Sequence, residues 1–445
     1  MSIATKYTKA LKEAKDLYFE NNENSFKSWK EANYYLPGGG TRSSLFVKPF
    51  PIFIKNGKGK EIFDLDEHKY IDFLSDFTSG IYGKSNSILK NSILNALDNG
   101  LQLGGHTQTE FLLAKELCSR FPSIELIRFA NSGTEANILS ISIGLEYTKR
   151  KKVVVFKGGY HGSVLSHFGE DHEGGDLKVP YDFLICPYND INGTKQKIEQ
   201  YKNEIGVILV EPMLGAGGCY PGTPEFLQSL RDLATEIGSI LIFDEVQTAR
   251  LSIGGRQKIL GITPDMTTLG KFFGGGFAFG AFGGKKEIMS LFDSRNPGSI
   301  AHGGTFNNSP LTMISGLTAI QEILTEENLN NLNKLGDEFR ENLNNFTLIN
   351  NIPFKITGLG SINQIHFNKL NSDSESNNEN EISNLNSIKE KDLLDLIYFK
   401  LLEKGFWISQ RGLISFNFEL NKNDIKNFEN ALLESFIQIN ELFIK

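Results

Sequence analysis

Two short stretches decide the fold of this chain: S-I-L-I-F-D-E-V-Q-T-A-R at Ser239–Arg250 and T-T-L-G-K-F-F-G-G-G at Thr267–Gly276. In the first, the apolar run I-L-I-F ends in an acid, Asp244. In the second, a short apolar run ends beside a lysine, Lys271, which is followed by two phenylalanines and three glycines. Short apolar runs bounded by turn signals are typical of buried strands. We therefore expect two strands, one of which delivers a carboxylate and the other an amine.

An amine and a carboxylate at strand ends suit pyridoxal phosphate (PLP). This cofactor forms a Schiff base with a lysine, and a carboxylate keeps its ring nitrogen protonated so that the ring accepts electrons. The two stretches therefore predict a PLP site in which Lys271 and Asp244 are catalytic residues. On this stretch alone, a surface lysine in a glycine-rich loop is the alternative interpretation.

Composition excludes several classes of protein. The chain has 445 residues, enough for two or three domains, and 40% hydrophobic with 22% charged residues is an ordinary globular balance. A net charge of −7 argues against a nucleic-acid partner. No apolar run approaches the roughly 18 residues of a membrane span. The N-terminal segment mixes acids and bases, unlike a signal or transit peptide, so we expect a cytoplasmic protein with no membrane partner. The three cysteines have neither metal-site nor disulfide spacing, and no metal site is expected.

The central part of the chain alternates apolar runs with helical segments, which predicts an α/β fold with a largely parallel sheet covered on both faces. The expected strands are Leu126–Ala130, Val153–Phe156, Phe183–Cys186, Val207–Val210, Ile240–Phe243 and Met266–Leu269. Ligands bind beyond the carboxyl ends of such strands. Polar motifs follow four of these runs: G-G-Y-H-G, E-P, D-E and G-K. The glycine-rich segment Phe272–Gly284 is interpreted as a loop.

Three regions are expected along the chain. Residues 1–75 hold a helical arm and a small antiparallel meander, residues 76–325 form the large cofactor-binding domain, and residues 326–445 return to the smaller α+β domain. Within the last region, residues 368–387 are rich in Asn, Ser and Glu and too polar to pack. We interpret them as a disordered surface insertion.

The motif N-S-G-T-E-A-N opens a helix and offers Ser132, Gly133 and Thr134 to a phosphate. A helix N-terminus provides free backbone N–H groups and the positive end of its dipole. An ordinary Ser or Thr N-cap is the alternative interpretation of the same residues. In G-G-Y-H-G, Tyr160 is expected to lay its ring against a flat cofactor, with His161 beside it, although a core tyrosine in a turn would give the same pattern.

Three further residues complete the expected cofactor site. Gln247 follows D-E-V within reach of the hydroxyl side of the ring, and Val246 is placed to pack on the ring face opposite the aromatic one. Glu211, at the start of E-P, is expected to orient the same region. A lysine against an electron-poor ring is expected to serve as a base at neutral pH, and this role falls to Lys271.

Taken together, these motifs resemble the class III (ω-type) aminotransferases of PLP fold type I, and among them the β-amino-acid (β-phenylalanine) aminotransferases. The resemblance covers about residues 30–440 and includes V-E-P-M-L-G-A-G-G-C, F-G-A-F-G-G and G-G-T-F-N-N. It implies a large domain with a mostly parallel seven-stranded sheet, a smaller α+β domain built from both termini, and a homodimer with active sites at the interface. It assigns the phosphate to Ser132, Gly133 and Thr134, with Thr305 reaching the phosphate of the neighbouring subunit. It also assigns ring stacking to Tyr160, the ring nitrogen to Asp244 and the Schiff base to Lys271, and these last three are the expected catalytic residues.

The same resemblance changes the interpretation of two arginines. Alone, Arg42 in P-G-G-G-T-R-S is a solvated surface charge, but the motif matches the loop in which family members hold the substrate carboxylate. S-Q-R-G matches a C-terminal loop whose arginine, here Arg411, receives the second carboxylate of the amino acceptor. The common form of this loop has proline where this chain has Gln410. Arginine suits a carboxylate because its planar guanidinium donates two parallel hydrogen bonds.

The resemblance implies transamination, in which an amino acid, expected to be a β-amino acid, passes its amino group through PLP to 2-oxoglutarate or pyruvate in a ping-pong cycle. The main alternative is glutamate-1-semialdehyde 2,1-aminomutase, a related enzyme that moves the amino group within one molecule to give 5-aminolevulinate. The C-terminal W-I-S-Q-R-G-L-I-S lacks the A-P-S-type run of that family, which favours the transaminase. A non-catalytic relative is disfavoured because Lys271 and Asp244 are both present.

Overall fold

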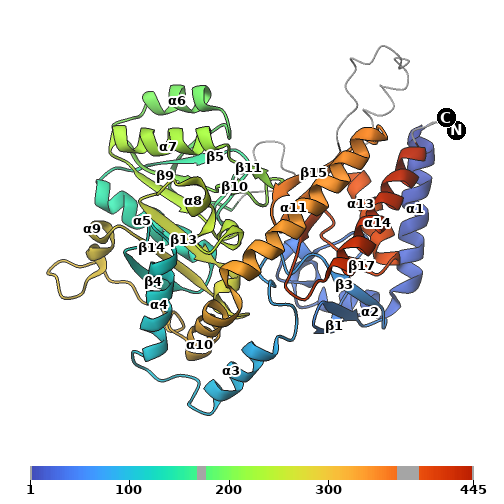
Figure 1. Cartoon of the computed structure of the whole chain (residues 1–445), viewed down its shortest axis with the longest axis horizontal. Helices are drawn as coiled ribbons and strands as arrows, with labels where there is room; N and C mark the ends of the chain where they lie inside the picture. The colour runs from blue at the N-terminus through green and yellow to red at the C-terminus, as the bar shows by residue number, and fades with distance from the viewer. Residues whose placement is uncertain (1–2, 168–176, 368–389, 443–445) are drawn as a thin grey trace. The chain divides into compact units, whose positions relative to one another are not determined.

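The computed structural model (Figure 1) describes residues 3–167, 177–367 and 390–442. The chain divides into two compact units: one combines residues 1–85 with 334–445, and the other spans 86–333. The divisions lie about ten residues beyond those expected from sequence, at 85/86 and 333/334 rather than 75/76 and 325/326. Backbone hydrogen bonds hold the segment after residue 75 in the terminal unit, for example from Lys84 N to Gly59 O and from Phe418 N to Ile81 O.

The central unit, residues 86–333, is built on a mostly parallel sheet. Within the described residues this sheet has seven strands in the order β4-β14-β13-β12-β9-β5-β8. The strands are β4 (Leu126–Ala130), β5 (Lys152–Phe156), β8 (Asp182–Cys186), β9 (Ile205–Val210), β12 (Ile240–Asp244), β13 (Met266–Gly270) and β14 (Gly280–Gly284). Strand β14 runs antiparallel to both of its neighbours, β13 and β4, whereas the other strand pairs described in this sheet are parallel. The predicted fold class is confirmed.

Strand β14 corrects one prediction. The segment Phe272–Gly284 was interpreted as a loop, but Gly280–Gly284 is a fully buried strand paired with both β13 and β4. Its glycines are required by packing, because a Cβ on Gly280 would lie 2.1 Å from the carbonyl oxygen of Ser132 and one on Gly283 would lie 2.6 Å from that of Leu126. Glycine carries no hydrophobic signal, so a strand rich in glycine looks like a loop in sequence.

Helices cover both faces of the sheet (Figure 1). Alternate residues of the central strands point to opposite sides, as the pleat of a strand requires. One set packs against α5 (Gly133–Thr148), as Val153, Val207 and Ile240 do. The other set packs against α6 (Ile191–Glu199) and α7 (Pro224–Ile237), as in the cluster of Val154, Ile208, Leu241 and Phe226. The sheet is therefore buried on both faces, which explains why its strands read as continuous apolar runs.

The remaining elements of the central unit surround this layer. They are α3 (Ser87–Leu97), α4 (Gln108–Arg120), α8 (Gly255–Leu260), α9 (Lys286–Met289), α10 (Pro310–Thr318), the π-helical turn η6 (Ala319–Ile323), the 3-10 turns η3 (Thr248–Leu251), η4 (Lys271–Gly274) and η5 (Ser290–Phe292), and the short pairs β6–β7 (Gly159–Tyr160, Ser166–His167) and β10–β11 (Met213–Leu214, Tyr220–Pro221). Helix α11 (Glu326–Ile349) crosses the division between the units.

The terminal unit has its own two sheets. The first joins β1 (Ile54–Lys58), β2 (Glu61–Asp64) and β3 (Lys69–Asp72) with β17 (Phe406–Trp407), and the second joins β15 (Phe354–Leu359), β16 (Ile362–Phe367) and β18 (Leu413–Ser415). Helices α1 (Ile3–Asn21), α2 (Glu23–Ala32), α13 (Glu390–Glu403) and α14 (Lys422–Glu441) complete the unit, with two 3-10 turns, η1 (Pro37–Gly39) and η2 (Ser43–Leu45). The first of these sheets combines strands from both ends of the sequence. The predicted insertion at 368–387 lies outside the described residues.

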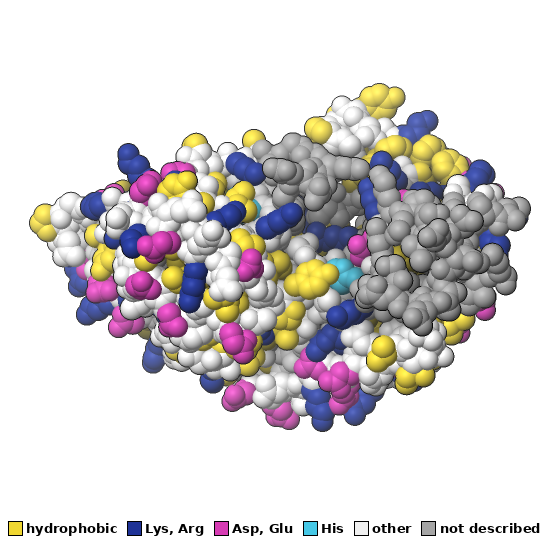
Figure 2. All heavy atoms as spheres, turned by 90° about the horizontal axis from the view of Figure 1, so that it is seen from above, with side chains coloured by type: hydrophobic (Ala, Val, Ile, Leu, Met, Phe, Trp, Pro, Cys, Tyr) yellow, Lys and Arg dark blue, Asp and Glu magenta, His cyan; other side chains and the backbone are white. Residues whose placement is uncertain are grey.

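The described surface offers no bilayer-spanning element and carries mixed charge. Every helix in the described ranges is too short or too polar to cross a lipid bilayer. On the face drawn in Figure 2, basic and acidic side chains are interspersed over the described residues.

Candidate functional site

The two strands that decided the prediction are neighbours in the sheet. Strands β12 and β13 pair in parallel, and their register places Asp244 opposite Thr268. Asp244 and Lys271 therefore leave the sheet at the same edge, where the carboxyl ends of parallel strands meet. A cavity of about 160 Å³ lies at this edge. It is lined by Gly133, Thr134, Asn137, Tyr160, His161, Gly162, Glu211, Asp244, Val246, Gln247 and Lys271.

Three donors hold the carboxylate of Asp244, which is 4% exposed. Its Oδ2 accepts hydrogen bonds from Nδ2 of Asn137 at 2.8 Å and from Nδ1 of His161 at 2.7 Å. Its Oδ1 accepts one from the backbone N–H of Val246 at 3.0 Å. Hydrogen bonds from three donors offset the cost of burying this polar group. They fix the carboxylate of Asp244 in position at the cavity.

Asn137 and Thr268 were not singled out from the sequence, yet they support this carboxylate. Asn137 also donates to the backbone oxygen of His161 at 3.1 Å, and its Oδ1 accepts from the hydroxyl of Thr268 at 2.7 Å. All the polar atoms of this buried amide are therefore paired. The available signal was the position of Asn137 in N-S-G-T-E-A-N, one helical turn beyond the residues expected at the phosphate.

The N-terminus of α5 faces the cavity, as the phosphate interpretation requires. Gly133 and Thr134 line it, while Ser132 is the N-cap and accepts a hydrogen bond from the backbone N–H of Glu135 at 3.1 Å. The serine hydroxyl thus has a capping role, and the free backbone N–H groups of the first turn are the anion donors. Gly162, also absent from the prediction, has a φ of +123°, and a Cβ there would lie 2.2 Å from Oγ1 of Thr134.

Glu211 anchors two of the loops around the cavity. Its carboxylate accepts hydrogen bonds from the backbone N–H of Tyr160 at 2.8 Å and from that of Gly215 at 3.0 Å. Burial raises the pKa of Glu211 to about 7; the nearby His161 lowers it and the charge of Asp244 raises it. A residue that ties Tyr160 in place agrees with the orienting role expected for Glu211.

Val246, Gln247 and Tyr160 define the space that a flat ring would fill. The side chain of Val246 packs against Gly133 and Gly270, so it forms one wall of the cavity. The side-chain oxygen of Gln247 is buried and has no hydrogen-bond partner among the described residues. Tyr160 remains 38% exposed. An unpaired buried amide oxygen beside a cavity is a position where a ligand group is expected, because leaving it unpaired costs free energy.

Lys271 itself has a strained backbone. Its φ is +54°, in the left-handed region that side chains other than glycine rarely adopt. It begins the turn η4 directly after β13 and lines the cavity. Such strain is kept where a particular side chain is needed at a particular point. These features fit PLP: an amine, a fixed carboxylate, a ring wall, an open amide and a helix N-terminus line one cavity.

Thr305 does not line this cavity and is exposed. Its loop is fastened to the central unit, because Asn307 Oδ1 accepts a hydrogen bond from Nδ2 of Asn131 at 2.8 Å. Asn131 lies just before the N-terminus of α5. The loop is therefore held near the end of the helix where a phosphate is expected.

The two predicted substrate arginines lie in the terminal unit. Arg42 donates to Oδ1 of Asp76 at 2.7 Å, and its guanidinium carbon lies 5.5 Å from the ring centre of Phe77. Arg411 lies 5.6 Å from the centre of the same ring. The loop that holds Arg411 lacks the usual proline, but Ser409 closes it, because its backbone and side-chain oxygens accept from the N–H groups of Gly412 and Leu413, both at 2.9 Å.

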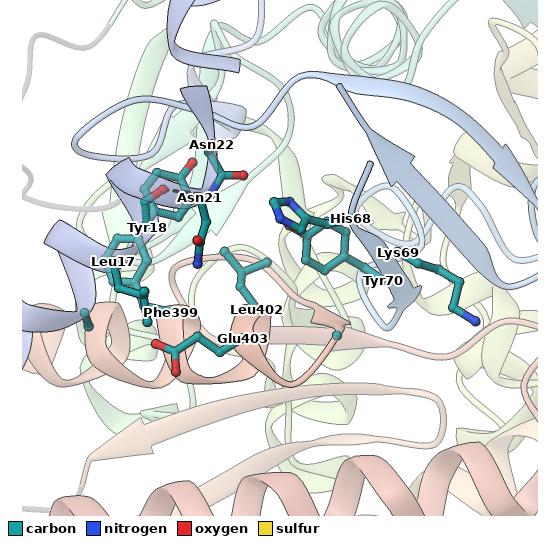
Figure 3. Close-up of a pocket in the computed structure, with 12 residues that line it drawn as sticks. Leu17, Tyr18, Asn21, Asn22, His68, Lys69, Tyr70, Phe399, Leu402 and Glu403 are labelled. Carbon is teal, nitrogen blue, oxygen red and sulfur yellow. Dashed lines mark hydrogen bonds between the residues drawn. The ribbon is translucent and has the colours of Figure 1, made fainter. Parts of the chain in front are cut away.

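The terminal unit also contains a second cavity of about 210 Å³ (Figure 3). His68 and Tyr70 line it and both bind the buried carboxylate of Asp64, at 2.9 Å each. Asn22 donates to the backbone oxygen of Tyr18 at 2.8 Å, the contact drawn in Figure 3. None of the predicted site residues lines this cavity. Within residues 3–167, 177–367 and 390–442, no three His, Cys, Asp or Glu side chains gather as metal ligands.

Comparison with known proteins identifies the family of this chain. The family described as aminotransferase class-III matches residues 44–427. The β-phenylalanine transaminase of Variovorax paradoxus is 41% identical over 96% of both chains. A crystal structure of the β-phenylalanine aminotransferase from the same organism superposes with a TM-score of 0.90 at 40% identity, covering 97% of each chain. A glutamate-1-semialdehyde 2,1-aminomutase of Wigglesworthia glossinidia brevipalpis is 38% identical over 77% of this chain and 82% of its own.

Proposed function

Because this chain belongs to the class III aminotransferases, we propose that it moves an amino group from a β-amino acid to a 2-oxo acid such as 2-oxoglutarate or pyruvate. Members of the family depend on pyridoxal phosphate, and this chain is a PLP-dependent aminotransferase. The observation that carries the proposal is the cavity in which Lys271 and the triply hydrogen-bonded Asp244 leave adjacent strand ends.

When bound, PLP supplies an aldehyde that takes up the amino group and a ring that accepts electrons from the carbon bearing it. Asp244 keeps the ring nitrogen protonated, and the donors of Asn137, His161 and Val246 keep Asp244 charged. The α5 N-terminus at Gly133 holds the phosphate.

The walls of the cavity position the ring. Tyr160 and Val246 enclose its two faces, and Gln247 offers its unpaired amide to the ring hydroxyl. Glu211 fixes the backbone of Tyr160 through a 2.8 Å hydrogen bond. These residues orient the cofactor.

The Nζ of Lys271 moves the proton from the donor carbon and later returns a proton to the acceptor carbon. The donor leaves as an oxo acid before the acceptor enters, so the kinetics are ping-pong. Each cycle exchanges one amino group for one carbonyl oxygen, and no external oxidant or reductant is required.

The two arginines receive the carboxylates of the substrates. Arg42 binds the carboxylate of the amino donor, and Arg411 binds the second carboxylate of a dicarboxylic acceptor. The name of the Variovorax relative supports a β-amino acid as donor. We further propose a homodimer in which Thr305 contacts the phosphate in the neighbouring subunit, working in the cytoplasm.

A second candidate is the intramolecular amino transfer of glutamate-1-semialdehyde 2,1-aminomutase. The relative from Wigglesworthia, 38% identical over 77% of this chain, supports it. This reaction uses the same residues around PLP but needs no external acceptor.

One paired assay separates the candidates. Purified PLP-loaded protein is given β-phenylalanine with 2-oxoglutarate in one tube and glutamate-1-semialdehyde without acceptor in another. We expect glutamate in the first tube and no 5-aminolevulinate in the second. Lys271→Ala should abolish turnover, while Lys258→Ala, which changes a half-exposed lysine outside the cavity, should not. Production of 5-aminolevulinate alone would establish the aminomutase, and retained turnover in Lys271→Ala would refute the role of that lysine.

A further inference from the structure

The residues Ser75, Asp76, Phe77 and Thr78 form a left-handed turn. Their φ angles are +47°, +44°, +53° and +78°, and none of the four is glycine. Left-handed residues other than glycine, asparagine and aspartate are uncommon singly, and each costs about 1–2 kcal/mol. Four in succession require strong support from the surrounding chain.

That support is present within the terminal unit. The backbone N–H of Ser75 donates to Oδ1 of Asp72 at 2.9 Å, and its hydroxyl donates to the backbone oxygen of Ser415 at 2.8 Å. The hydroxyl of Ser79 contacts the backbone oxygen of Asp76 at 2.8 Å and its carboxylate at 3.1 Å. Phe77 is 8% exposed. The turn is therefore held rigidly, with one exposed carboxylate and one buried ring at defined positions.

Both predicted substrate arginines meet this turn. Their guanidinium carbons lie 5.5 Å (Arg42) and 5.6 Å (Arg411) from the centre of the Phe77 ring. Each distance is within the range of a cation–π contact. Arg42 and Arg411, from opposite ends of the sequence, thus contact one aromatic ring, which we call the aromatic platform. The two positive charges repel each other, so their proximity alone is not favourable. Such an arrangement is expected where both groups belong to one binding site for carboxylates.

Asp76 lowers the net positive charge of the cluster formed by Arg42 and Arg411. It accepts one hydrogen bond from Nη1 of Arg42, with both side chains about half exposed. The pKa of Asp76 is lowered: burial opposes the shift, while Arg42, Ser79 and Lys84 produce it. Lys84 itself pairs with Asp72 at 2.6 Å. Arg42, Asp76 and Arg411 together therefore carry a net charge of +1, and four of the five N–H donors of Arg42 remain for a ligand.

We propose that the Ser75–Thr78 turn positions the substrate carboxylate site and that Asp76 tunes it for ligands with a single carboxylate. Phe77 aligns the two guanidinium groups. Asp76 fixes Arg42 through one nitrogen and offsets part of the positive charge that Arg42 and Arg411 together offer to a dicarboxylate. Asp76 and Phe77 are positioning residues, and the inference rests on the proposed role of Arg42 and Arg411. Asp76 then influences the choice between pyruvate and 2-oxoglutarate as acceptor.

The test compares two unreactive acids that differ by one carboxylate, butyrate and glutarate. Their dissociation constants are measured by calorimetry on the PLP-loaded full chain. In Asp76→Asn, glutarate should gain between about 1.5- and fivefold over butyrate, the range for a half-exposed charge pair. Glu67→Gln is the matched control, because Glu67 is also left-handed (φ +64°) and paired with a lysine, Lys55. The ratio should not change in the control.

Phe77 is tested by a half-reaction. In Phe77→Leu, the concentration of β-phenylalanine that gives the half-maximal single-turnover rate should rise about five- to thirtyfold, the loss of two cation–π contacts. For an amine without a carboxylate, the concentration that gives the half-maximal rate should be the same in Phe77→Leu and in the wild type. The variant Phe77→Tyr, which keeps an aromatic ring, should have the wild-type value for β-phenylalanine. A merely structural role would affect both donors equally.

The outcomes distinguish this inference from the proposed function. If Arg42→Ala abolishes butyrate binding but the glutarate-to-butyrate ratio in Asp76→Asn equals that of wild type, the charge-tuning inference is wrong and the role of Arg42 stands. If neither acid binds the wild-type protein, both are wrong. If Phe77→Leu slows both donors alike, the aromatic platform has no role in carboxylate positioning.

Discussion

Asn137 offers the sharpest test of how the site is built. The substitution Asn137→Ala removes three hydrogen bonds from a residue that is 1% exposed. One, to the charged carboxylate of Asp244, is worth about 1.5–3 kcal/mol, and the bonds to His161 and Thr268 are worth about 1 kcal/mol each. We therefore expect the free energy of unfolding to fall by about 3.5–5 kcal/mol.

The same substitution should weaken the binding of PLP. With one donor fewer, the carboxylate of Asp244 is held less firmly, and its interaction with a protonated ring nitrogen weakens. A loss of 1.5 kcal/mol or more corresponds to at least about a tenfold rise in the dissociation constant of PLP. Urea unfolding of the PLP-free protein measures the first effect, and fluorescence titration with PLP measures the second.

Ser140→Ala is the matched control for this experiment. Ser140 is buried on the same helix and makes one side-chain hydrogen bond, to the backbone oxygen of Ala136 at 2.7 Å. Its loss should reduce stability by about 1 kcal/mol or less and leave PLP affinity unchanged. If Asn137→Ala behaves like Ser140→Ala in both assays, the hydrogen bonds of Asn137 contribute neither the expected stability nor the expected PLP affinity.

Two further predictions concern packing and pH. Gly280→Ala should lower thermal stability and PLP affinity together, because the new Cβ would lie 2.1 Å from the carbonyl oxygen of Ser132, the N-cap of α5; Gly105→Ala, where a Cβ meets nothing within 4 Å, should change neither. Burial raises the pKa of Asp395 to about 6, so the protonated carboxyl favours the folded state, and the free energy of unfolding should fall by about 1–3 kcal/mol between pH 4 and 6. Urea unfolding at a series of pH values should show a flatter slope for Asp395→Asn. Glu403→Gln, which changes an exposed residue of the same helix, should keep the wild-type slope.

The pH prediction depends on the surroundings of Asp395. Lys15, Lys391 and Lys48 lower the pKa of this carboxyl and Asp392 raises it, but burial is the largest cause and raises it. An acid whose folded pKa exceeds its unfolded pKa stabilises the protein below the unfolded value and loses that contribution as pH rises through the folded one. An unchanged slope in Asp395→Asn would show that other groups set the pH dependence.

For Gly280→Ala, wild-type PLP affinity would show that the contact with Ser132 is relieved without moving the helix.

The sequence was most informative where burial on both faces forced a simple pattern. The parallel strands β5, β9 and β12 appear as unbroken apolar runs because both faces are covered, and their ends carry the polar motifs. This pattern predicts Asp244 and Lys271 at one edge of the sheet, and β12 and β13 pair in parallel there. Strand β14 could not be predicted in this way, because its glycines are required by close contacts with other segments of the chain and show no hydrophobic pattern in the sequence.

Supporting residues were harder to predict than the residues they support. Asn137 and Thr268 have residue types that are common in helices and strands for many reasons, and their importance appears only when the hydrogen bonds to Asp244 and to each other are seen. The convergence of Arg42 and Arg411 on Phe77 joins the two ends of the chain. Local pattern does not carry such information, because the contact depends on tertiary structure.

Backbone strain connects the two proposed sites. Several left-handed residues have an ordinary local explanation: Lys149 is the C-cap of α5, and Asn189 and Asn351 are of the type that tolerates this conformation. Neither explanation applies to Lys271 or Phe77, nor to Glu67, Ser75, Thr78 and Cys219. Lys271 and Phe77 differ from the other four in that the side chain faces a proposed ligand site, and glycine at either position would relieve about 1–2 kcal/mol of strain. Glycine would also remove the amine from one site and the aromatic platform from the other. The strain at these two positions is therefore evidence that the side chains, rather than the path of the backbone, are what the fold is holding in place.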